Sequence, residues 1–501
     1  MKVSAGPATQ TVPLPDETAT ARLAEDIAAA LLPGDILALS GDLGAGKSLL
    51  ARAAIRALAG QPDLDVPSPT FALRIEYPLD RFAVTHADLY RLTAESEIDE
   101  LGLEEALDTG ALVVEWPDRL RRPLSAERLD VILEDRNGGR VARLTPHGSW
   151  PDRLARSRLI RAFVDSAGWD NSSRTPIIGD ASAKAFERVT QAGRTAIVMN
   201  AAEQPEGPPL HDGRSYDAIA HRARTVEPFI ALAAQLRARG IHAPEILAAD
   251  IDAGLVLLED LGQDGIVGAG GKAVLPRYEA AVDLLIAIHG QDWPAVASAP
   301  GGARHAVPVY DRDALLIEIS LFADWYVGAD GRPAWTAAER EEFLTAWKSV
   351  LSALTADRET WVLRDFHSPN ILWIDGASGL DRVGVVDFQD TVRGHPSYDV
   401  ASLAQDARVA LTPDDEAMLK ARYLDGRRTA DPAFDAAAFE AAYAVCGAQR
   451  ATKILGAFSR LAGIGGKPGY LRHIDRTREV LRGNLSHPVL SALRVWYAPF
   501  M

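Results

Sequence analysis

The stretch Ser40 to Ser48, which reads Ser-Gly-Asp-Leu-Gly-Ala-Gly-Lys-Ser, constrains the fold of this chain more than any other feature. It follows the short apolar run Ile36 to Leu39 and precedes helical spacing of apolar residues from Ser48 to Leu58. A glycine turn between a buried strand and a helix directs backbone N–H groups and the positive end of the helix dipole at a phosphate. The pattern therefore predicts a phosphate-binding P-loop.

In such a loop Lys47 is expected to reach the β- and γ-phosphates of ATP, and the Ser48 hydroxyl is expected to bind Mg²⁺. The residues predicted to contact the nucleotide are Gly41, Asp42, Gly44, Ala45, Gly46, Lys47 and Ser48.

A second and different pattern begins with Asp365 and Asn370, which have Asp-x-x-x-x-Asn spacing after the expected strand Trp361 to Leu363. Asp387 follows the apolar run Gly384 to Val386. In kinase-type phosphoryl transfer one carboxylate positions the acceptor hydroxyl, while an amide and a second carboxylate hold Mg²⁺. We assign these roles to Asp365, Asn370 and Asp387 respectively. Two unrelated ATP chemistries in one chain predict a fusion protein.

The bulk composition agrees with several domains. A chain of 501 residues is too long for one hydrophobic core. A net charge of −16 argues against stable, direct binding of nucleic acid, because phosphate neutralisation needs clustered cations. The single cysteine, Cys446, excludes an intramolecular disulfide framework. With neither a secretory signal nor a long apolar run visible, we expect a cytoplasmic protein without a membrane span.

The predicted fold class is α/β, with a P-loop NTPase domain followed by a two-lobed, protein-kinase-like α+β domain. We expect a helix over Thr18 to Leu32, strands over Phe82 to His86 and Ala111 to Val114, and a hairpin over 131–145. The predicted boundaries are 1–148 for the P-loop domain, 153–260 for the kinase-like N-lobe and 261–501 for its C-lobe with the catalytic loop.

The segment from Pro13 to Pro123 resembles the TsaE (YjeE) family of ATPases, which support threonylcarbamoyladenosine formation in tRNA. The resemblance is carried by the P-loop, by Ser68-Pro69-Thr70-Phe71, by His86-Ala87-Asp88 and by Val114-Glu115-Trp116. It implies that Thr70 lies near the γ-phosphate, that Asp88 assists Mg²⁺ binding, and that Trp116 lies beside the nucleotide. Glu115 would be the catalytic or metal-linked carboxylate. The implied partners are the proteins of the complex that modifies adenosine 37.

The segment from Arg153 to Leu485 resembles the aminoglycoside-phosphotransferase-like kinases. Besides the catalytic loop, the motifs that carry the resemblance are Gly179-Asp180-Ala181-Ser182, Leu257 to Gly262, Asp387-Phe388-Gln389-Asp390 and Tyr398 to Leu403. It implies that Asp180 and Ser182 form a turn over the nucleotide and that Leu257 to Leu261, with Glu259, is the hinge that holds adenine. It also implies that Tyr398-Asp399 braces the catalytic loop. Within the family the chain is similar to the amino-sugar kinases (AmgK), which phosphorylate the anomeric hydroxyl of N-acetylmuramate and N-acetylglucosamine.

This sequence departs from the kinase pattern in two places. Leu363 stands where a histidine commonly precedes the catalytic aspartate by two residues. The strand Ala196 to Met199 lacks the usual phosphate-binding lysine, which Lys184 or Arg188 could replace from the preceding strand.

The leading hypothesis is a bifunctional ATPase and sugar kinase. Alternatives are a kinase for another hydroxyl acceptor, such as an aminoglycoside or a choline-like compound, and a nucleotide-binding regulatory scaffold. Two further features favour structural roles: His289 as a packed helix-end residue, and Phe322, Trp325 and Tyr326 as core residues rather than a sugar-stacking surface.

Overall fold

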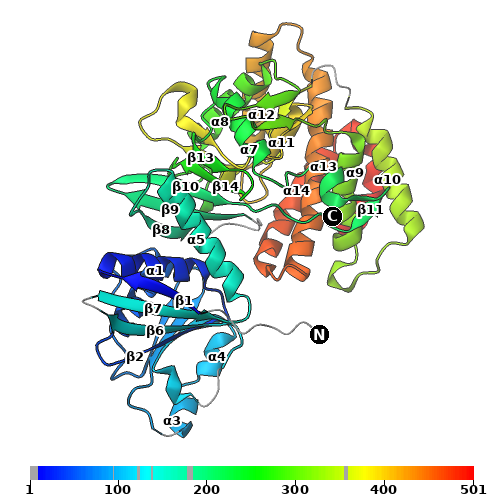
Figure 1. Ribbon diagram of the computed structural model, residues 1–501. Helices are drawn as coiled ribbons and strands as arrows, with labels where there is room; N and C mark the ends of the chain where they lie inside the picture. Colours follow the sequence, from blue (N-terminus) through cyan, green and yellow to red (C-terminus); the bar gives the residue numbers. More distant parts are fainter. Residues whose placement is uncertain (1–8, 94, 121–123, 137–138, 178–183, 355–358) are drawn as a thin grey trace. The chain divides into compact units, whose positions relative to one another are not determined.

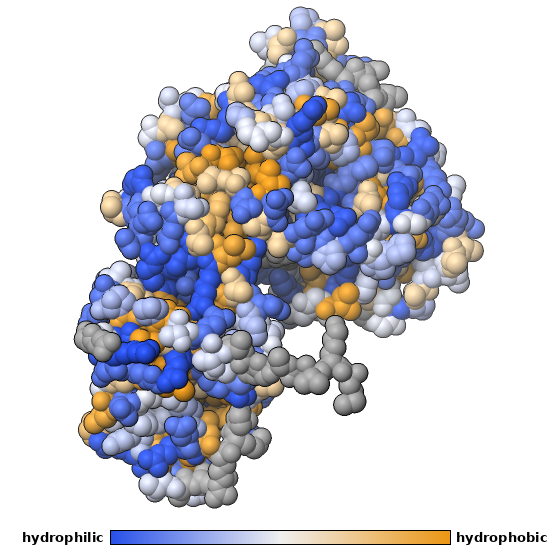
Figure 2. Space-filling view, viewed as in Figure 1, coloured by the Kyte–Doolittle hydropathy of each residue, from blue (hydrophilic) through white to orange (hydrophobic). Residues whose placement is uncertain are grey.

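The computed structural model describes residues 9–501 with the exception of 94, 121–123, 137–138, 178–183 and 355–358 (Figure 1). The chain forms two compact units, one of residues 1–202 with 247–260 and one of residues 203–246 with 261–501. The division passes between Asp260 and Leu261, at the segment predicted as a hinge. Among the described helices, none is long and apolar enough to cross a membrane. Hydrophilic residues cover most of the face seen in Figure 2.

The first unit begins with a seven-stranded sheet in which the central strands are parallel. The strand order is β1 (Gln10–Leu14), β7 (Gly139–Pro146), β6 (Arg128–Arg136), β2 (Ile36–Gly41), β5 (Gly110–Glu115), β4 (Ala83–Asp88) and β3 (Arg74–Pro78). Strand β2 pairs in parallel with both β5 and β6, and β4 pairs in parallel with β5. The carboxyl ends of these parallel strands therefore meet at one edge, which is where α/β sheets place their ligands.

Alternate residues of β2 explain the two layers of helices. Leu37 and Leu39 pack with α1 (Glu17–Ala30) and α2 (Lys47–Ala59) in one hydrophobic core. Ile36 and Ala38 pack on the opposite face, in a second core that includes Leu103 of α4 (Leu103–Leu107). A short helix α3 (Glu95–Asp99) precedes α4. Because both faces are covered, the strand reads as a continuous apolar run instead of an alternating one.

The same unit contains a five-stranded sheet of the order β13 (Ile246–Asp250), β14 (Leu255–Glu259), β10 (Arg194–Asn200), β9 (Ala185–Gln191) and β8 (Ser173–Ile177). Helix α5 (Trp150–Ser166) joins the two sheets. Trp150 and Leu154 at its start belong to the core of the first sheet, whereas Ile160 and Val164 pack on the second. Helix α5 thus has side chains in two cores.

The second unit is mainly helical. Its helices are α6 (Tyr216–Ile219), α7 (Glu227–Arg237), α8 (Leu275–His289), α9 (Arg312–Leu321), α10 (Ala337–Leu351), α11 (Ser397–Ala404), α12 (Pro413–Ala430), α13 (Ala436–Gly463), α14 (Ile474–Leu485) and α15 (Arg494–Tyr497). Four two-stranded pairs accompany them: β11 (Pro209–His211) with β12 (Arg214–Ser215), β15 (Val296–Ser298) with β16 (Arg304–Ala306), β17 (Thr360–Val362) with β20 (Val392–Gly394), and β18 (Ile371–Trp373) with β19 (Val383–Val385).

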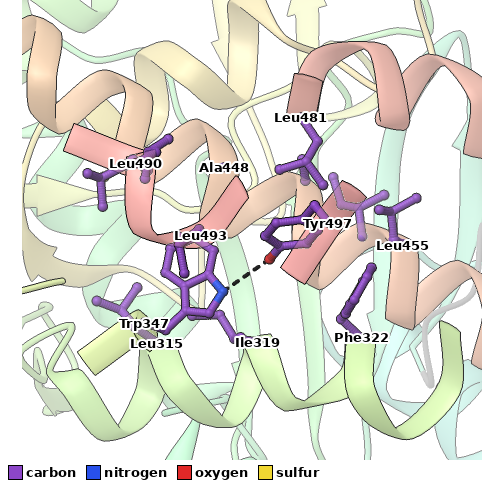
Figure 3. Close-up of a cluster of buried hydrophobic side chains, with 14 of the residues drawn as sticks. Leu315, Ile319, Phe322, Trp347, Ala448, Leu455, Leu481, Leu490, Leu493 and Tyr497 are labelled. Atoms are coloured by element: carbon purple, nitrogen blue, oxygen red, sulfur yellow. Dashed lines mark hydrogen bonds between the residues drawn. The ribbon is translucent and has the colours of Figure 1, made fainter. Parts of the chain in front are cut away.

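A large core of this unit lies among α9, α10, α13 and the C-terminal helices (Figure 3). At its centre the buried Trp347 donates a hydrogen bond from Nε1 to the hydroxyl of Tyr497, at 3.0 Å. Phe322 and Tyr326 belong to this core and are 0% and 2% exposed. These two rings therefore pack within the protein, as the helical spacing favoured, and are not available to stack on a sugar.

Most predicted elements of the P-loop domain are confirmed, including α1, β2, α2 and the β6–β7 hairpin. Between Tyr216 and Arg237 the chain forms two helices, because Ser215 caps the short α6 and α7 starts separately at Glu227. Strand β1 was not predicted from the sequence, because Pro13 interrupts its strand pattern. A proline is tolerated there because β1 is an edge strand paired only with β7.

Candidate functional sites

The P-loop links the end of β2 to the start of α2. Gly46 caps α2 with φ 103°, and Gly41 has φ 139° with Leu133 so close that a Cβ would lie 2.4 Å from its carbonyl oxygen. Both positions therefore require glycine. Lys47 is buried, and its Nζ donates to the carbonyl oxygens of Gly41 and Asp42 at 2.8 Å each. Burial lowers the pKa of Lys47, which Glu115, Asp88 and Asp42 partly oppose.

Two carboxylates meet beside this loop. Asp88 and Glu115 end the neighbouring strands β4 and β5 and are directly paired in the parallel register. Ser48 Oγ donates to Glu115 Oε2 at 2.9 Å. Thr70 Oγ1 donates to Asp88 Oδ2 at 3.0 Å. The four side chains predicted to serve the phosphate and the metal are thus brought together by the ends of two strands, the start of α2 and the loop at Thr70.

Trp116 follows β5 in a left-handed conformation, with φ 61°. This turn places the Lys47 ammonium 3.9 Å from the centroid of its ring. The Tyr90 ring also packs against the Trp116 ring, with ring centroids 4.9 Å apart. The aromatic ring therefore lies at the lysine of the P-loop, beside the position expected for the nucleotide.

Sequence reasoning missed two residues of this site. His86 Nε2 lies 3.0 Å from Glu115 Oε1, and both side chains are almost fully buried. The signal was available, since His86 precedes Asp88 by two residues on one strand and so shares its face. Arg140, on β7, lies against the loop: its Nη2 donates to the carbonyl oxygen of Gly44 at 3.4 Å. No spacing rule in the sequence links residue 140 to the P-loop.

The second site is built on two two-stranded pairs, β17 with β20 and β18 with β19. Asp365 follows β17, and Asn370 immediately precedes β18. Asn370 Nδ2 donates to the backbone oxygen of Asp365 at 2.9 Å. Its own backbone oxygen accepts from the Val386 N–H at 3.0 Å, which brings Asn370 next to Asp387. Asp387 has φ 59°, so the chain turns sharply where the metal-binding carboxylate is predicted.

Asp399 at the start of α11 holds the catalytic loop by its backbone. Its two carboxylate oxygens accept from the N–H groups of Leu363 and Arg364, at 2.7 and 2.9 Å. Arg364 itself has φ 64°, an uncommon conformation for an arginine. The bracing role expected for Asp399 is confirmed as a structural contact. Leu363, at the position where a histidine is common, is buried.

A buried carboxylate on α9 fixes the arginine of this loop from another side. Glu318 Oε1 accepts from both Arg364 Nη2 and Lys453 Nζ, at 2.5 and 2.7 Å. Its Oε2 accepts from the Tyr310 hydroxyl and from Gln449. Burial raises the pKa of Glu318, but Lys453 and Arg364 outweigh it and lower that pKa to about 2. Glu318 therefore stays ionised.

The electrostatics of Asp365 follow the same logic. Partial desolvation raises its pKa, while the positive charges around it, that of Lys453 above all, lower it more strongly, to well below its usual range. Asp365 is thus an ionised carboxylate held in a positive local potential. His367, buried in the same loop, has a pKa lowered mainly by burial, so it is neutral near pH 7.

Of the residues predicted to act in the kinase-like N-lobe, the structure describes some and leaves out others. Asp180 and Ser182 lie outside the described residues. Glu259 ends β14, where it pairs with Ala196 of β10. Arg188 on β9 lies opposite Ile197 of β10, and its guanidinium binds both carboxylate oxygens of Asp260, at 2.6 and 3.1 Å. His289 is buried and hydrogen bonds to the Tyr423 hydroxyl at 2.8 Å, as expected for a packed helix-end residue.

Comparison with known proteins agrees with this geometry. Residues 14–143 match the family described as threonylcarbamoyl adenosine biosynthesis protein TsaE. Residues 173–436, more than half of the chain, match the phosphotransferase enzyme family APH. A TsaE protein of Rickettsia conorii is 37% identical over 159 residues, which cover 31% of this chain and 89% of that protein. The chain belongs to both families.

Two relatives of the phosphotransferase part carry the name N-acetylmuramate/N-acetylglucosamine kinase. The protein from Caulobacter vibrioides is 35% identical over 348 residues, covering 67% of this chain and 94% of the relative. The protein from Pseudomonas aeruginosa is 31% identical over 347 residues, covering 64% and 90%. The predicted fold class is thereby confirmed: a TsaE-type P-loop domain precedes a protein-kinase-like phosphotransferase domain.

The residues of both sites suit ATP, which both families use. At the P-loop, the glycine turn and the start of α2 offer backbone N–H groups to phosphate, and the Ser48 hydroxyl lies among carboxylates. At the second site, the amide of Asn370 and the carboxylate of Asp387 are oxygen donors of the kind that Mg²⁺ prefers.

Proposed function

We propose that this protein is a bifunctional enzyme. Its N-terminal domain is an ATPase that supports threonylcarbamoylation of adenosine 37 in tRNA, and its C-terminal domain is an ATP-dependent kinase for the anomeric hydroxyl of N-acetylmuramate and N-acetylglucosamine. The observation that carries the proposal is that side chains predicted for phosphoryl transfer gather in two places, Ser48 beside Glu115 and Asn370 beside Asp365. The near-complete coverage of relatives from both families supports it.

In the kinase domain Asp365 accepts the hydrogen bond of the sugar hydroxyl and takes up its proton as the oxygen attacks the γ-phosphate of ATP in line. A carboxylate in a positive local potential is ionised and ready for this task. Asn370 and Asp387 would hold Mg²⁺, which neutralises charge on the phosphates when bound. Asp399 and Glu318 keep the loop in its left-handed turn at Arg364, so Asp365 is oriented before substrate arrives.

In the N-terminal domain the backbone N–H groups of 44–48 bind the phosphates of ATP, and Lys47 turns from the loop carbonyls to the γ-phosphate. Ser48 would hold Mg²⁺, with Asp88 in support. Glu115, fixed by His86, orients the attacking water. The hydrogen bond from Thr70 to Asp88 links the loop at 68–71 to the metal-binding carboxylate. This loop is therefore the segment expected to respond to the γ-phosphate.

The substrate of the second site is tested with a panel of acceptors in a coupled ADP-release assay. N-acetylmuramate and N-acetylglucosamine should each stimulate ADP release and yield an acid-labile anomeric phosphate. An Asp365→Asn variant should lose this turnover by a factor of about 10³ or more. If an aminoglycoside or choline stimulated ADP release and neither amino sugar did, the sugar-kinase assignment would be wrong.

The role of the first site is tested by adding the protein to a reconstituted threonylcarbamoyl transferase complex with tRNA, ATP and threonylcarbamoyl-adenylate precursors. The wild-type protein should restore multiple-turnover modification, and Lys47→Ala should not. If Lys47→Ala supports modification as well as the wild type, nucleotide turnover at the P-loop is not the contribution of this domain. If neither domain turns over ATP, the protein is a nucleotide-binding scaffold.

A further inference from the structure

One face of α13 places polar groups beside the catalytic loop. Lys453 lies four positions after Gln449 and three positions after Arg450, so it neighbours each of them on the surface of the helix. Gln449 Nε2 and Lys453 Nζ both bind the buried carboxylate of Glu318, at 3.0 and 2.7 Å. The same carboxylate holds Arg364, the residue directly before Asp365. A single buried anion therefore fixes Lys453 next to the catalytic loop.

Lys453 keeps the capacity to bind a further group. Its side chain is 20% exposed, in contrast to the 1% of Glu318. In the part of the chain that the structure describes, Glu318 Oε1 is the one carboxylate paired with its ammonium group, which has three N–H donors. Two donors thus remain for an acceptor at the exposed side of the group.

The surroundings of Asp365 favour an anion over a cation. Lys453 is linked through Glu318 to Arg364, the residue before Asp365, and Arg450 lies three positions before Lys453 on α13, so cations gather where the acceptor must bind. Arg450 is 7% exposed, and its Nε is buried without a partner among the described residues. The half-exposed Arg222 adds a third cation, 3.7 Å from Asp390. Such a site repels a polycationic acceptor and attracts one that carries a carboxylate.

We propose that Lys453 binds the carboxylate of an acidic sugar acceptor and thereby makes the kinase prefer N-acetylmuramate over N-acetylglucosamine. The inference rests on the proposed sugar-kinase function. The two sugars share the pyranose ring, the acetamido group and the anomeric hydroxyl, but only N-acetylmuramate carries a lactyl carboxylate. A charged hydrogen bond to that group strengthens binding of one sugar and leaves the other unaffected.

The test compares kcat/KM for the two sugars in the full-length wild type, Lys453→Met and Lys453→Arg. The methionine variant removes the charge but keeps an apolar stem, and Arg364, Tyr310 and Gln449 remain as partners of Glu318. We expect Lys453→Met to lower kcat/KM for N-acetylmuramate by about 10- to 100-fold, mainly through KM. N-acetylglucosamine lacks the carboxylate and therefore reports what the lost charge does to Glu318 and Asp365, so the deciding quantity is the ratio of the two kcat/KM values, which should fall by about tenfold or more. Lys453→Arg should restore most of the preference.

Lys348→Gln is the matched control, because Lys348 is an exposed lysine on α10 that pairs with Glu341. It should leave both sugars at wild-type values. Turnover of N-acetylglucosamine in the methionine variant reports that the protein is folded. Equal losses for both sugars, or a raised KM for ATP in place of the sugar effect, would overturn the inference while leaving the kinase assignment intact. A wild type that turns over neither sugar refutes the kinase assignment and this inference together.

Discussion

Asp26 on α1 and Arg174 on β8 form a buried ion pair, with 2.8 Å between Oδ1 and Nη1. Asp26 belongs to the TsaE-type part of the chain and Arg174 to the phosphotransferase part. The pair is extended by Arg161 of α5, which binds Asp26 and Glu25, and by Glu187 of β9, which binds Arg174. A largely buried ionic network therefore joins two domains that belong to unrelated families.

Replacing Asp26 by alanine should destabilise the protein by about 3 kcal/mol, because it leaves two buried guanidinium groups short of a partner. Urea unfolding followed by tryptophan fluorescence measures the loss. Arg22→Gln is the matched control, since Arg22 pairs with Asp165 in the same region but both side chains are more exposed, at 22% and 30%. It should cost less than about 1 kcal/mol. Equal effects would show that the network is not a buried link.

Lys47→Ala should reduce basal nucleotide hydrolysis at the P-loop by more than about 100-fold, because the γ-phosphate loses its cation. Sugar-dependent ADP release should stay within about twofold of the wild type, since no residue of the second site depends on Lys47. Both activities are measured in the same preparation with and without N-acetylmuramate. A parallel loss of the two activities would contradict the assignment of separate sites.

His86→Asn tests whether the histidine positions Glu115. The variant should lower P-loop ATP hydrolysis by about tenfold while nucleotide affinity changes little, because the carboxylate loses a partner but keeps Ser48. Glu115→Gln should lower hydrolysis by about 100-fold or more. Single-turnover kinetics and nucleotide binding by fluorescence separate the two steps. If His86→Asn bound nucleotide poorly, we would assign His86 a structural role only.

Asp399→Ala should lower kcat of the kinase by about 100-fold, since the N–H groups of Leu363 and Arg364 lose their acceptors and the loop that carries Asp365 relaxes. Affinity for ATP and for the sugar should fall far less than kcat. Ser402→Ala serves as a comparison, because its hydroxyl makes a weaker contact, at 3.3 Å, with the Arg364 carbonyl oxygen. An unchanged kcat in Asp399→Ala would contradict the hypothesis that Asp399 orients the catalytic loop.

The acid sensitivity of the protein should depend on Glu318. Its pKa is lowered from 4.5 to about 2 in the folded state, so the unfolded state binds more protons in that range. The stability that the ionised group contributes is therefore complete above pH 4.5 and is lost as pH falls toward 2. Glu318→Gln should be destabilised at pH 7, and its difference from the wild type should shrink below pH 4.5. Chemical denaturation at pH 7, 5, 4 and 3 measures this difference, and a constant difference would contradict it.

The two motifs show how far sequence reasoning reaches. The P-loop, Asp88, Glu115, Asp365, Asn370 and Asp387 are recognisable because each lies at a fixed offset from a short apolar strand. The structure confirms those strands as β2, β4, β5, β17 and β19. Local spacing suffices here because the strand and its following turn together place the functional side chain.

His86, Arg140, Glu318 and Lys453 are different, because their roles depend on residues from 29 to 135 positions away in the chain. His86 has one local signal, its place two residues before Asp88 on β4, whereas Arg140, Glu318 and Lys453 have no spacing that distinguishes them from ordinary helix or strand residues. Glu318 would be read from the sequence as a solvated carboxylate, yet it is 1% exposed and binds two cations. Its partners become visible only once α9, α13 and the catalytic loop are packed together.

The sequence by itself determined that the chain carries two phosphoryl-transfer sites, because the backbone geometry of a P-loop and of a catalytic loop is encoded within a few neighbouring residues. Only the tertiary structure decided how those sites are held and charged. Asp26 meets Arg174, and Glu318 meets both Arg364 and Lys453, across distances that no local pattern specifies. The physical reason is that buried charges are stable only when paired, and the partner is chosen by packing rather than by position in the chain.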